Sequence, residues 1–234
     1  LCFSFFYFIM FQKATIIVAG GSGSRMHSET PKQFLKLNGV PILLHTIQQF
    51  ISYDSSIQII LVLPVSHIHL WEKLVIEYPI NHVIDIVEGG ETRYESVQNG
   101  MKILENNKNV KVVGVHDGVR PLVSQTTIST CFEHAYLTGN AIPFMPIDET
   151  LRKITEHTSH WVNRAEYVSI QTPQCFKTEI LQNAYAQNYN HTFTDDATVV
   201  ESIGQKMNLV AGNRENIKIT RPEDLVFAEK LIAQ

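Results

Sequence analysis

Residues 14–26 read ATIIVAGGSGSRM, an apolar run that leads directly into a glycine-rich turn. The run predicts a buried strand over Thr15–Val18. Glycines let the backbone adopt positive φ and approach a ligand closely, so the amides of such a turn can converge on an anion. Arg25 ends the turn, and Lys32 follows in the triplet Pro31-Lys32-Gln33. Together these features predict a phosphate-binding loop; the alternative is a flexible turn with surface cations.

Two common phosphate-binding motifs do not fit this stretch. A Walker loop has a lysine directly after its last glycine, whereas the first lysine after Gly23 is Lys32. A dinucleotide-binding fingerprint needs a third glycine where Met26 stands, and an acidic residue at the end of the second strand. The second apolar run, Ile57–Leu63, ends in Pro64 instead. A P-loop is therefore excluded and a dehydrogenase is disfavoured.

The composition bounds the size of the fold and the kind of partner. With 234 residues, 44% hydrophobic and 18% charged, the chain can bury one substantial core and fits one α/β domain better than two. A net charge of -4 and a pI near 6.2 give no overall basic field, which argues against nucleic acid as a partner. We therefore expect a small ligand whose phosphates are attracted locally.

Cysteine usage and the N-terminus bear on location. The three cysteines, Cys2, Cys131 and Cys175, show no C-x-x-C pairing, which is typical of a reduced cytoplasmic protein.

The apolar run 1–11 has no basic region before it and no cleavage site after it, and it is too short to span a membrane. We expect the fold to start at Met10, with residues 1–9 as an extension outside it; a packed N-terminal segment is the alternative.

Short apolar runs alternate with longer helical patterns over the rest of the chain, which predicts an α/β fold whose mostly parallel sheet is covered on both faces. The expected strands are Thr15–Val18, Ile57–Leu63, Val83–Val87, Lys111–His116 and Met207–Ala211. The expected helix starts are Ser66, a capping box of Thr92 with Glu95, Ser124, and a second box of Thr220 with Glu223 that has Pro222 in its first turn.

The pattern breaks between about Ala141 and Gln171, where prolines and polar residues interrupt any helical period. We expect an extended hairpin or arm there, since a long irregular insertion in a compact domain is usually functional or an interface. Nothing else in the sequence marks a domain boundary, so residues 10–234 are expected to form one domain.

Several polar residues follow the predicted strands, where open α/β sheets bind their ligands. Asp117 ends the central strand with Arg120 three residues on, which suits a metal ion or ribose hydroxyls, or else a structural ion pair in a turn. A second glycine turn, Gly89-Gly90-Glu91, opens a helix that carries Ser96; it suits a nucleotide wall, or else an ordinary connection.

Other cations and a histidine complete the candidates. Lys218 lies in a β-like stretch and suits a phosphate. Thr150 and Arg164 lie in the expected arm, where an arginine is more often a solvated charge. His116 is interpreted as structural, because transfer to a phosphate nucleophile needs no general base.

The ordered set of motifs resembles the 2-C-methyl-D-erythritol 4-phosphate cytidylyltransferases of the non-mevalonate isoprenoid pathway. The matching pieces run from about Gln12 to the end: Ala19 to Met26, Pro31-Lys32-Gln33, Gly89 to Val97, His116-Asp117-x-x-Arg120-Pro121, Thr172-Pro173-Gln174, Thr194-Asp195-Asp196-Ala197 and Asn216 to Leu225. No single piece is decisive, but the order makes the set specific.

The resemblance implies a Rossmann-like nucleotidyltransferase fold, a homodimer built through the arm, and Mg²⁺-dependent transfer of CMP from CTP to a polyol phosphate. It implies catalytic roles for Arg25, Lys32, Arg164 and Lys218, with Arg164 reaching in from the partner's arm. It implies nucleotide contacts from Ala19, Gly20, Gly21, Ser22, Gly23, Ser24, Gly89, Gly90, Glu91, Ser96 and Asp117, with Asp117 also near the metal ion. It implies an acceptor pocket that includes Arg120, Thr150, Thr172 and Asp195.

Departures from the family pattern affect the acceptor side more than the reaction. Gly118-Val119 replaces a common pair of alanines, Glu149 replaces an aspartate before Thr150, and Glu215 replaces an aspartate before Asn216. The nearest rival function is a cytidylyltransferase for another polyol phosphate, such as ribitol 5-phosphate. A catalytically silent nucleotide-binding protein is a rival of another class, but Arg25 and Lys32 are both present.

Overall fold

The computed structural model describes residues 11–21, 26, 28–105 and 107–232. The expected extension at residues 1–9 lies outside the described residues. So do four residues of the predicted phosphate loop, Ser22, Gly23, Ser24 and Arg25.

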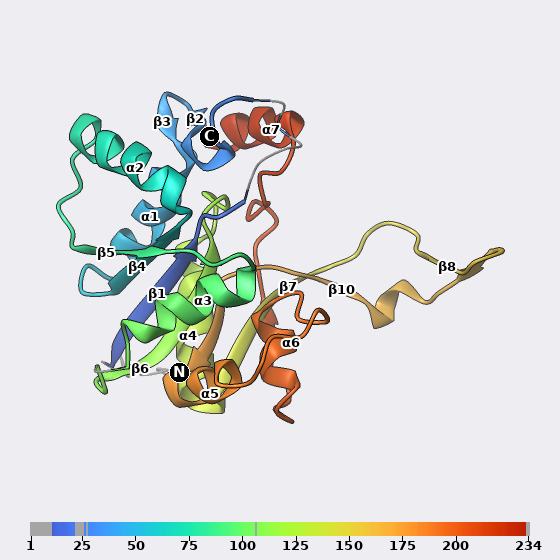
Figure 1. The fold of residues 1–234 in the computed structure, drawn as a ribbon. Coiled ribbons are helices and arrows are strands. Elements are labelled where there is room, and N and C mark those ends of the chain that lie inside the picture. Colours follow the sequence, from blue (N-terminus) through green and yellow to red (C-terminus); the bar gives the residue numbers. More distant parts are fainter. Residues whose placement is uncertain (1–10, 22–25, 27, 106, 233–234) are drawn as a thin grey trace, which may run out of the picture.

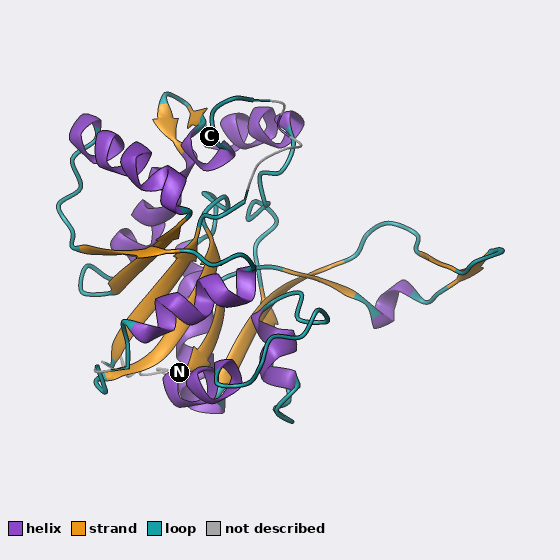
Figure 2. Cartoon of the chain, in the orientation of Figure 1, coloured by secondary structure: helices purple, strands orange, loops and turns teal. Residues whose placement is uncertain are grey.

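The described chain forms an α/β fold around an eight-stranded sheet of order β10-β7-β11-β6-β1-β4-β5, with β12 paired to β7 (Figures 1 and 2). Four neighbouring strands are parallel: β5 (Ile84–Glu88), β4 (Gln58–Leu63), β1 (Gln12–Val18) and β6 (Val110–Asp117). Beyond β6, antiparallel pairing adds β11 (Gln174–Lys177), β7 (Asn140–Pro146) and β10 (Val168–Ile170), while β12 (Leu209–Ala211) runs parallel to β7.

Helices cover both faces because successive residues of a strand point to opposite sides of the sheet. Ile17 of β1 belongs to one core cluster and Ile16 to the other. The first cluster is covered by α1 (Ile42–Tyr53), α2 (Val65–Glu77) and α4 (Gln125–Thr138). The second is covered by α3 (Arg93–Lys102), α5 (Thr178–Tyr185) and α6 (Asp196–Glu201). The expectation of a sheet covered on both faces is confirmed.

A third, smaller cluster fixes the C-terminal segment near the carboxyl end of β6. Val119 and Ile219 are both buried in it, and the Ile219 amide donates to the Val119 carbonyl at 2.9 Å. This contact sets the position of Lys218, one residue earlier. The cluster also joins α7 (Pro222–Ile232) to the small hairpin of β2 (Lys36–Leu37) and β3 (Val40–Pro41), which follows the 3-10 helix η2 (Lys32–Phe34).

The five expected strands are confirmed with ends shifted by a few residues, but two helix starts differ. The capping box of Thr92 with Glu95 and the cap at Ser124 are both present. The start at Ser66 is wrong, because α2 begins at Val65 directly after the extended Pro64. The box of Thr220 with Glu223 is also wrong: the Asp224 carboxylate accepts the amides of Thr220 and Arg221, both at 2.8 Å.

The arm is shorter than the expected span of 141–171. Its two ends are strands of the sheet, β7 and β10, which pair with each other from Phe144 to Pro146 and from Val168 to Ile170. Pro143 hides this strand in the sequence, yet its carbonyl accepts the Gln171 amide at 2.8 Å, a bond that needs no proline N–H. Between the two strands the chain projects from the body, with the hairpin of β8 (Arg152–Ile154) and β9 (Ser159–Trp161) at the tip and the 3-10 helix η3 (Arg164–Glu166) beside it (Figure 1).

Candidate active site

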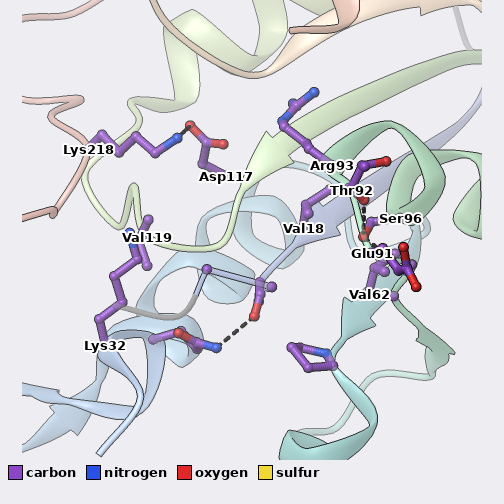
Figure 3. Close-up of a pocket in the computed structure, with 17 residues that line it drawn as sticks. Val18, Lys32, Val62, Glu91, Thr92, Arg93, Ser96, Asp117, Val119 and Lys218 are labelled. Atoms are coloured by element: carbon purple, nitrogen blue, oxygen red, sulfur yellow. Dashed lines mark hydrogen bonds and ion pairs between the residues drawn. The ribbon is translucent and has the colours of Figure 1, made fainter. Parts of the chain in front are cut away.

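A cavity of about 270 Å³ opens at the carboxyl ends of the parallel strands (Figure 3). Val18 of β1, Val62 of β4 and Asp117 of β6 contribute to its wall. The two glycine turns, η2, the start of α3, the C-terminal segment and the residues just after β4 and β6 supply the rest: Ala19, Gly20, Gly21, Lys32, Gln33, Pro64, Gly89, Gly90, Glu91, Thr92, Arg93, Ser96, Val119 and Lys218. Segments from residue 18 to residue 218 thus meet in one site.

The second glycine turn is held rigidly against α3. The Gly89 amide donates to the Leu63 carbonyl at 2.8 Å, and the Gly90 amide donates to Ser96 Oγ at 3.2 Å. Ser96 Oγ in turn donates to the Thr92 carbonyl at 2.9 Å. A Cβ at Gly90 would overlap Glu95 Cβ, so a side chain there requires movement of the helix cap.

Lys32 is the first residue of η2, and its side chain lies against the first glycine turn. It is only 8% exposed, and its Nζ donates to the Ile219 carbonyl at 3.5 Å. A Cβ at Gly21 would lie 3.2 Å from Lys32 Cε, so the absence of a side chain at Gly21 leaves room for the lysine. Here the cavity is therefore lined by the backbone of the described part of the turn and by one buried cation, Lys32.

Asp117 is an ionised carboxylate surrounded by cations. Its Oδ2 contacts Arg120 Nε at 2.9 Å and Lys218 Nζ at 3.2 Å, and Figure 3 shows Lys218 and Asp117 pointing toward each other. Burial opposes ionisation, but Lys218, Arg120 and Arg93 together hold the pKa of Asp117 well below its usual range. Positive charge is thus gathered around one anion beside the cavity.

Behind Asp117, the buried His116 is held in its neutral form. Its Nε2 lies 3.3 Å from the Arg120 carbonyl, which can only accept, so Nε2 carries the proton. Its Nδ1 accepts from Thr172 Oγ1 at 2.9 Å, and Thr172 Oγ1 accepts the Asp117 amide at 3.2 Å. Burial lowers the pKa of His116 to about 4. This geometry supports a structural role, in which His116 fixes Thr172 and the backbone of Asp117.

Protein stability is expected to depend on pH through His116. Its folded pKa lies below that of the unfolded chain, so below about pH 6.5 the unfolded chain binds a proton that the folded protein refuses. The free energy of unfolding should therefore fall by about 2 kcal/mol from this group as the pH drops from about 7.5 to about 5. Urea unfolding of the wild type and of His116→Gln at both pH values tests this, and equal pH dependence in the two proteins would contradict it.

Comparison with known proteins identifies the family. The sequence profile of the 2-C-methyl-D-erythritol 4-phosphate cytidylyltransferases matches residues 14–234. The protein of that name from Phocaeicola vulgatus is 49% identical over 93% of this chain and 98% of its own length, and the one from Bacteroides fragilis is 47% identical over 94% and 99%. The chain belongs to this cytidylyltransferase family.

Solved structures of the same kind share the fold. The 4-diphosphocytidyl-2C-methyl-D-erythritol synthase from Anaerococcus prevotii superposes with a TM-score of 0.80 at 26% identity, covering 96% of this chain and 97% of that one. The 2-C-methyl-D-erythritol 4-phosphate cytidylyltransferase from Thermus thermophilus gives 0.75 at 29% identity, with 96% and 100% covered. The expected nucleotidyltransferase fold and enzyme class are therefore confirmed.

The structure brings together one part of the predicted site. Ten predicted residues line the cavity: Ala19, Gly20, Gly21, Lys32, Gly89, Gly90, Glu91, Ser96, Asp117 and, from the C-terminal segment, Lys218. Arg120 and Thr172 lie behind Asp117, where Arg120 Nη1 also donates to the Asn216 carbonyl at 2.8 Å.

Three predicted residues lie elsewhere in this single chain. Thr150 and Arg164 are exposed on the arm, where Arg164 donates to the Asp148 carbonyl. Asp195 caps α6, and its carboxylate accepts from the Thr198 amide at 2.9 Å and from Gln174 Nε2 at 2.8 Å.

Two cavity residues were not singled out from the sequence. Gln33 is fully buried, and Arg93 leaves the cavity wall to pair with the buried Asp196 at 2.6 Å. Both stand inside quoted motifs, but the partners that give them a role, Ala19 and Asp196, are 14 and 103 residues away in the chain. Only the folded structure shows these pairings.

The donor set fits a magnesium ion that is held mainly by a nucleotide. Among the residues that the structure describes, no group of three His, Cys, Asp or Glu side chains is placed to hold a metal ion. Mg²⁺ is usually bound by one or two carboxylates together with substrate phosphates, and Asp117 is a buried carboxylate of that kind. Since Asp117 Oδ2 already contacts two cations, a metal ion bound there would share this carboxylate with them.

Within the described ranges, no helix has both the length and the apolar character needed to cross a membrane.

Proposed function

We propose that this chain transfers CMP from CTP to its acceptor in the cavity between the two glycine turns. In this proposal Mg²⁺ binds the triphosphate, and a second copy of the chain completes the acceptor side. The reaction follows from family membership: CMP passes from CTP to 2-C-methyl-D-erythritol 4-phosphate, giving 4-diphosphocytidyl-2-C-methyl-D-erythritol and pyrophosphate. The convergence of Lys32, Lys218 and Asp117 beside two glycine turns is the observation that supports this cavity as the site.

In the proposed mechanism, an oxygen of the acceptor phosphate attacks the α-phosphorus of CTP, and the bond from that phosphorus to pyrophosphate breaks. The attacking phosphate is already anionic, so no general base is needed, in keeping with the neutral, buried His116. Negative charge crowds the reacting centre, so preorganised cations supply most of the acceleration. We assign that role to Lys32 and Arg25, and the positioning of the acceptor phosphate to Lys218 and Arg164.

We assign the nucleotide to the two glycine turns. The first turn, Ala19 to Ser24, takes the triphosphate, while Gly89, Gly90, Glu91 and Ser96 face the cytidine and Asp117 lies near the ribose and the metal ion. When bound, Mg²⁺ neutralises triphosphate charge and makes pyrophosphate a better leaving group. We assign the acceptor side to Arg120 and Thr172, with Thr150 contributed by the partner's arm. Asp195 takes part indirectly, because its contact with Gln174, two residues after Thr172, keeps this side in shape, as the contact of Thr172 with His116 does.

The arm supports the proposal of a homodimer. It exposes large apolar side chains, with Ile154 83% and Trp161 68% accessible, which is unusual for a surface that stays in water. Arg164 and Thr150 lie on the same arm, away from the cavity of their own chain. A partner's arm can bring these two residues to the acceptor side. The free, buried thiols of Cys131 and Cys175 fit the proposed reducing, cytoplasmic location.

Pyrophosphate release with CTP and Mg²⁺ tests the acceptor and the metal. We expect turnover with 2-C-methyl-D-erythritol 4-phosphate, little with ribitol 5-phosphate, and loss of turnover when EDTA removes the metal. Turnover with ribitol 5-phosphate alone would keep the chemistry and reassign the acceptor. Full activity in EDTA would overturn the role of the metal.

Arg164→Ala is expected to raise the KM for the acceptor while the KM for CTP changes little, because the cation would position only the acceptor phosphate. If Arg164 comes from the partner, mixing Arg164→Ala with Lys32→Ala protein should restore activity, since some hybrid sites then contain both wild-type residues. Steady-state assays before and after subunit exchange measure this. Confirmed hybrid dimers with no recovery would contradict the shared site.

A further inference from the structure

Gln33 connects the catalytic wall of the cavity to α2. It follows Lys32 directly in η2, it is fully buried, and it lines the cavity. Its Nε2 donates to the Ala19 carbonyl at 2.7 Å and lies 3.0 Å from Nδ1 of His67, in the first turn of α2. One amide group therefore joins the start of the first glycine turn to a histidine outside the family motifs.

The hydrogens of this amide determine the protonation state of His67. A carbonyl can only accept, so one amide hydrogen goes to Ala19, and the other goes to His67 Nδ1 only if that nitrogen has a free lone pair. His67 must then be neutral, with its proton on Nε2. In the opposite amide orientation, Gln33 Oε1 would face the Ala19 carbonyl oxygen, and neither atom can donate. In the orientation described here, Oε1 has no hydrogen-bond partner among the described residues.

The surroundings of His67 favour the same form. Burial, and then the nearby His69, lower the pKa of His67. The ring is also fixed in orientation, because it meets the Phe34 ring edge to face at 5.9 Å between centroids. The titratable side chains on α2 besides His67 are His69, Glu72, Lys73 and Glu77, and η2 carries Lys32. Of these groups, His69 is the one whose charge lowers the pKa of His67.

The carbonyl that Gln33 holds belongs to the residue before the glycines. The Ala19 amide is fixed separately, donating to the Val62 carbonyl at 3.0 Å. With the carbonyl also held, the peptide planes on both sides of Ala19 are set, and so is the direction in which Gly20 leaves the strand. Lys32 and Gln33 are adjacent in one short helix, so a change at Gln33 that moves the backbone of η2 also moves the lysine.

We propose that neutral His67 is a positioning residue of the active site: by accepting from Gln33, it orients the amide that fixes Ala19 and the start of the first glycine turn for catalysis. This inference rests on the proposed function of the cavity. His67 touches no substrate, so it acts only through Gln33. Turnover should therefore depend on whether the side chain at position 67 has a hydrogen-bond acceptor where Nδ1 lies.

Two substitutions of His67 separate the effect of its hydrogen-bond acceptor from the effect of the packing of its ring. His67→Asn places an amide oxygen close to the position of Nδ1 and takes up no proton, while His67→Leu removes the acceptor and keeps apolar contact with Phe34. We expect His67→Leu to lower kcat/KM for CTP by about 10- to 100-fold, because small misplacements of catalytic groups have effects of that size. His67→Asn should stay within about threefold of the wild type. The control is His69→Leu on the exposed side of the same helix, which should match the wild type.

Two further readouts are independent of the size of that loss. The wild-type kcat/KM should fall at acid pH, below the usual range of a histidine, as His67 becomes protonated and can no longer accept, and His67→Asn should lack this component of the pH profile. In the ¹⁵N NMR spectrum, His67 of the wild type should show the neutral form with hydrogen on Nε2.

Wild-type kinetics in His67→Leu, failure of His67→Asn to rescue, or a proton on Nδ1 would each overturn the proposal. These outcomes are distinguishable from failure of the proposed function. If wild-type protein releases no pyrophosphate from CTP and the acceptor, the function fails, while the NMR spectrum and the Kd for CTP of the two variants still test the link from His67 to the glycine turn.

Discussion

Lys32→Ala is expected to lower kcat by about 100-fold or more, while the Kd for CTP rises by a smaller factor. The lysine is buried beside Gly21 in the cavity wall, where a charge is poorly screened by water. Its interaction with phosphate oxygens should strengthen as negative charge gathers on the reacting phosphorus, so its loss affects the transition state more than the bound substrate. Single-turnover kinetics and equilibrium binding of CTP measure the two effects separately.

Lys36→Ala is the matched control. Lys36 lies four residues later, is exposed, and pairs with Glu77 at 3.3 Å on the surface. Its removal should leave kcat and the Kd unchanged, because it takes no part in the cavity wall. Equal losses of binding and turnover in Lys32→Ala would show that the lysine stabilises bound CTP rather than the transition state.

Asp196→Asn is expected to lower the free energy of unfolding by about 3 kcal/mol. Asp196 is fully buried, accepting from Arg93 Nη2 at 2.6 Å and from the Tyr185 hydroxyl at 2.7 Å. Burial by itself lowers the pKa of Arg93, and Asp196 more than compensates, so this pKa is raised and the charge is retained. The amide variant keeps most of the volume but leaves the guanidinium without its counter-charge.

Urea unfolding of Asp196→Asn, of Arg93→Gln and of the double variant gives the coupling between the two side chains. The matched control is Glu77→Gln, which breaks the exposed pair with Lys36 and should leave stability almost unchanged. A loss in Asp196→Asn as small as that of the control would contradict a stabilising buried pair. Because Arg93 also faces the cavity, kcat/KM for CTP should fall in the same variant.

The sequence predicts the parallel half of this sheet well and the antiparallel half poorly. The strands β1, β4, β5 and β6 are largely apolar runs that end near glycine, proline or polar residues, which is the usual pattern of buried parallel strands. By contrast, β11 has four residues and β10 has three, too few for a periodic pattern, and β7 contains two prolines. Strands of this kind are stabilised by their neighbours more than by their own residue preferences.

The site divides along similar lines. Glycine turns and Asp117 are predictable because their chemistry is local: a turn needs residues without side chains, and a strand end exposes polar groups. The coupling of Arg93 to Asp196 and of His67 to Gln33 depends on segments that meet only in the folded chain. Helix starts failed where a proline or a neighbouring acid took over the cap, at Pro64 and at Asp224.

The order in which the chain is synthesised bears on when the cavity becomes complete. Its first wall is made at Val18 and Ala19, but Asp117 follows about a hundred residues later, and Lys218 about a hundred residues after that. The central strand β1 pairs with β6, whose residues lie about a hundred positions further on. A nascent chain that ends before Asp117 therefore holds its first glycine turn and Lys32 without that carboxylate and without Lys218. The cavity is complete only after Ile219 has docked against Val119 and brought Lys218 to the site.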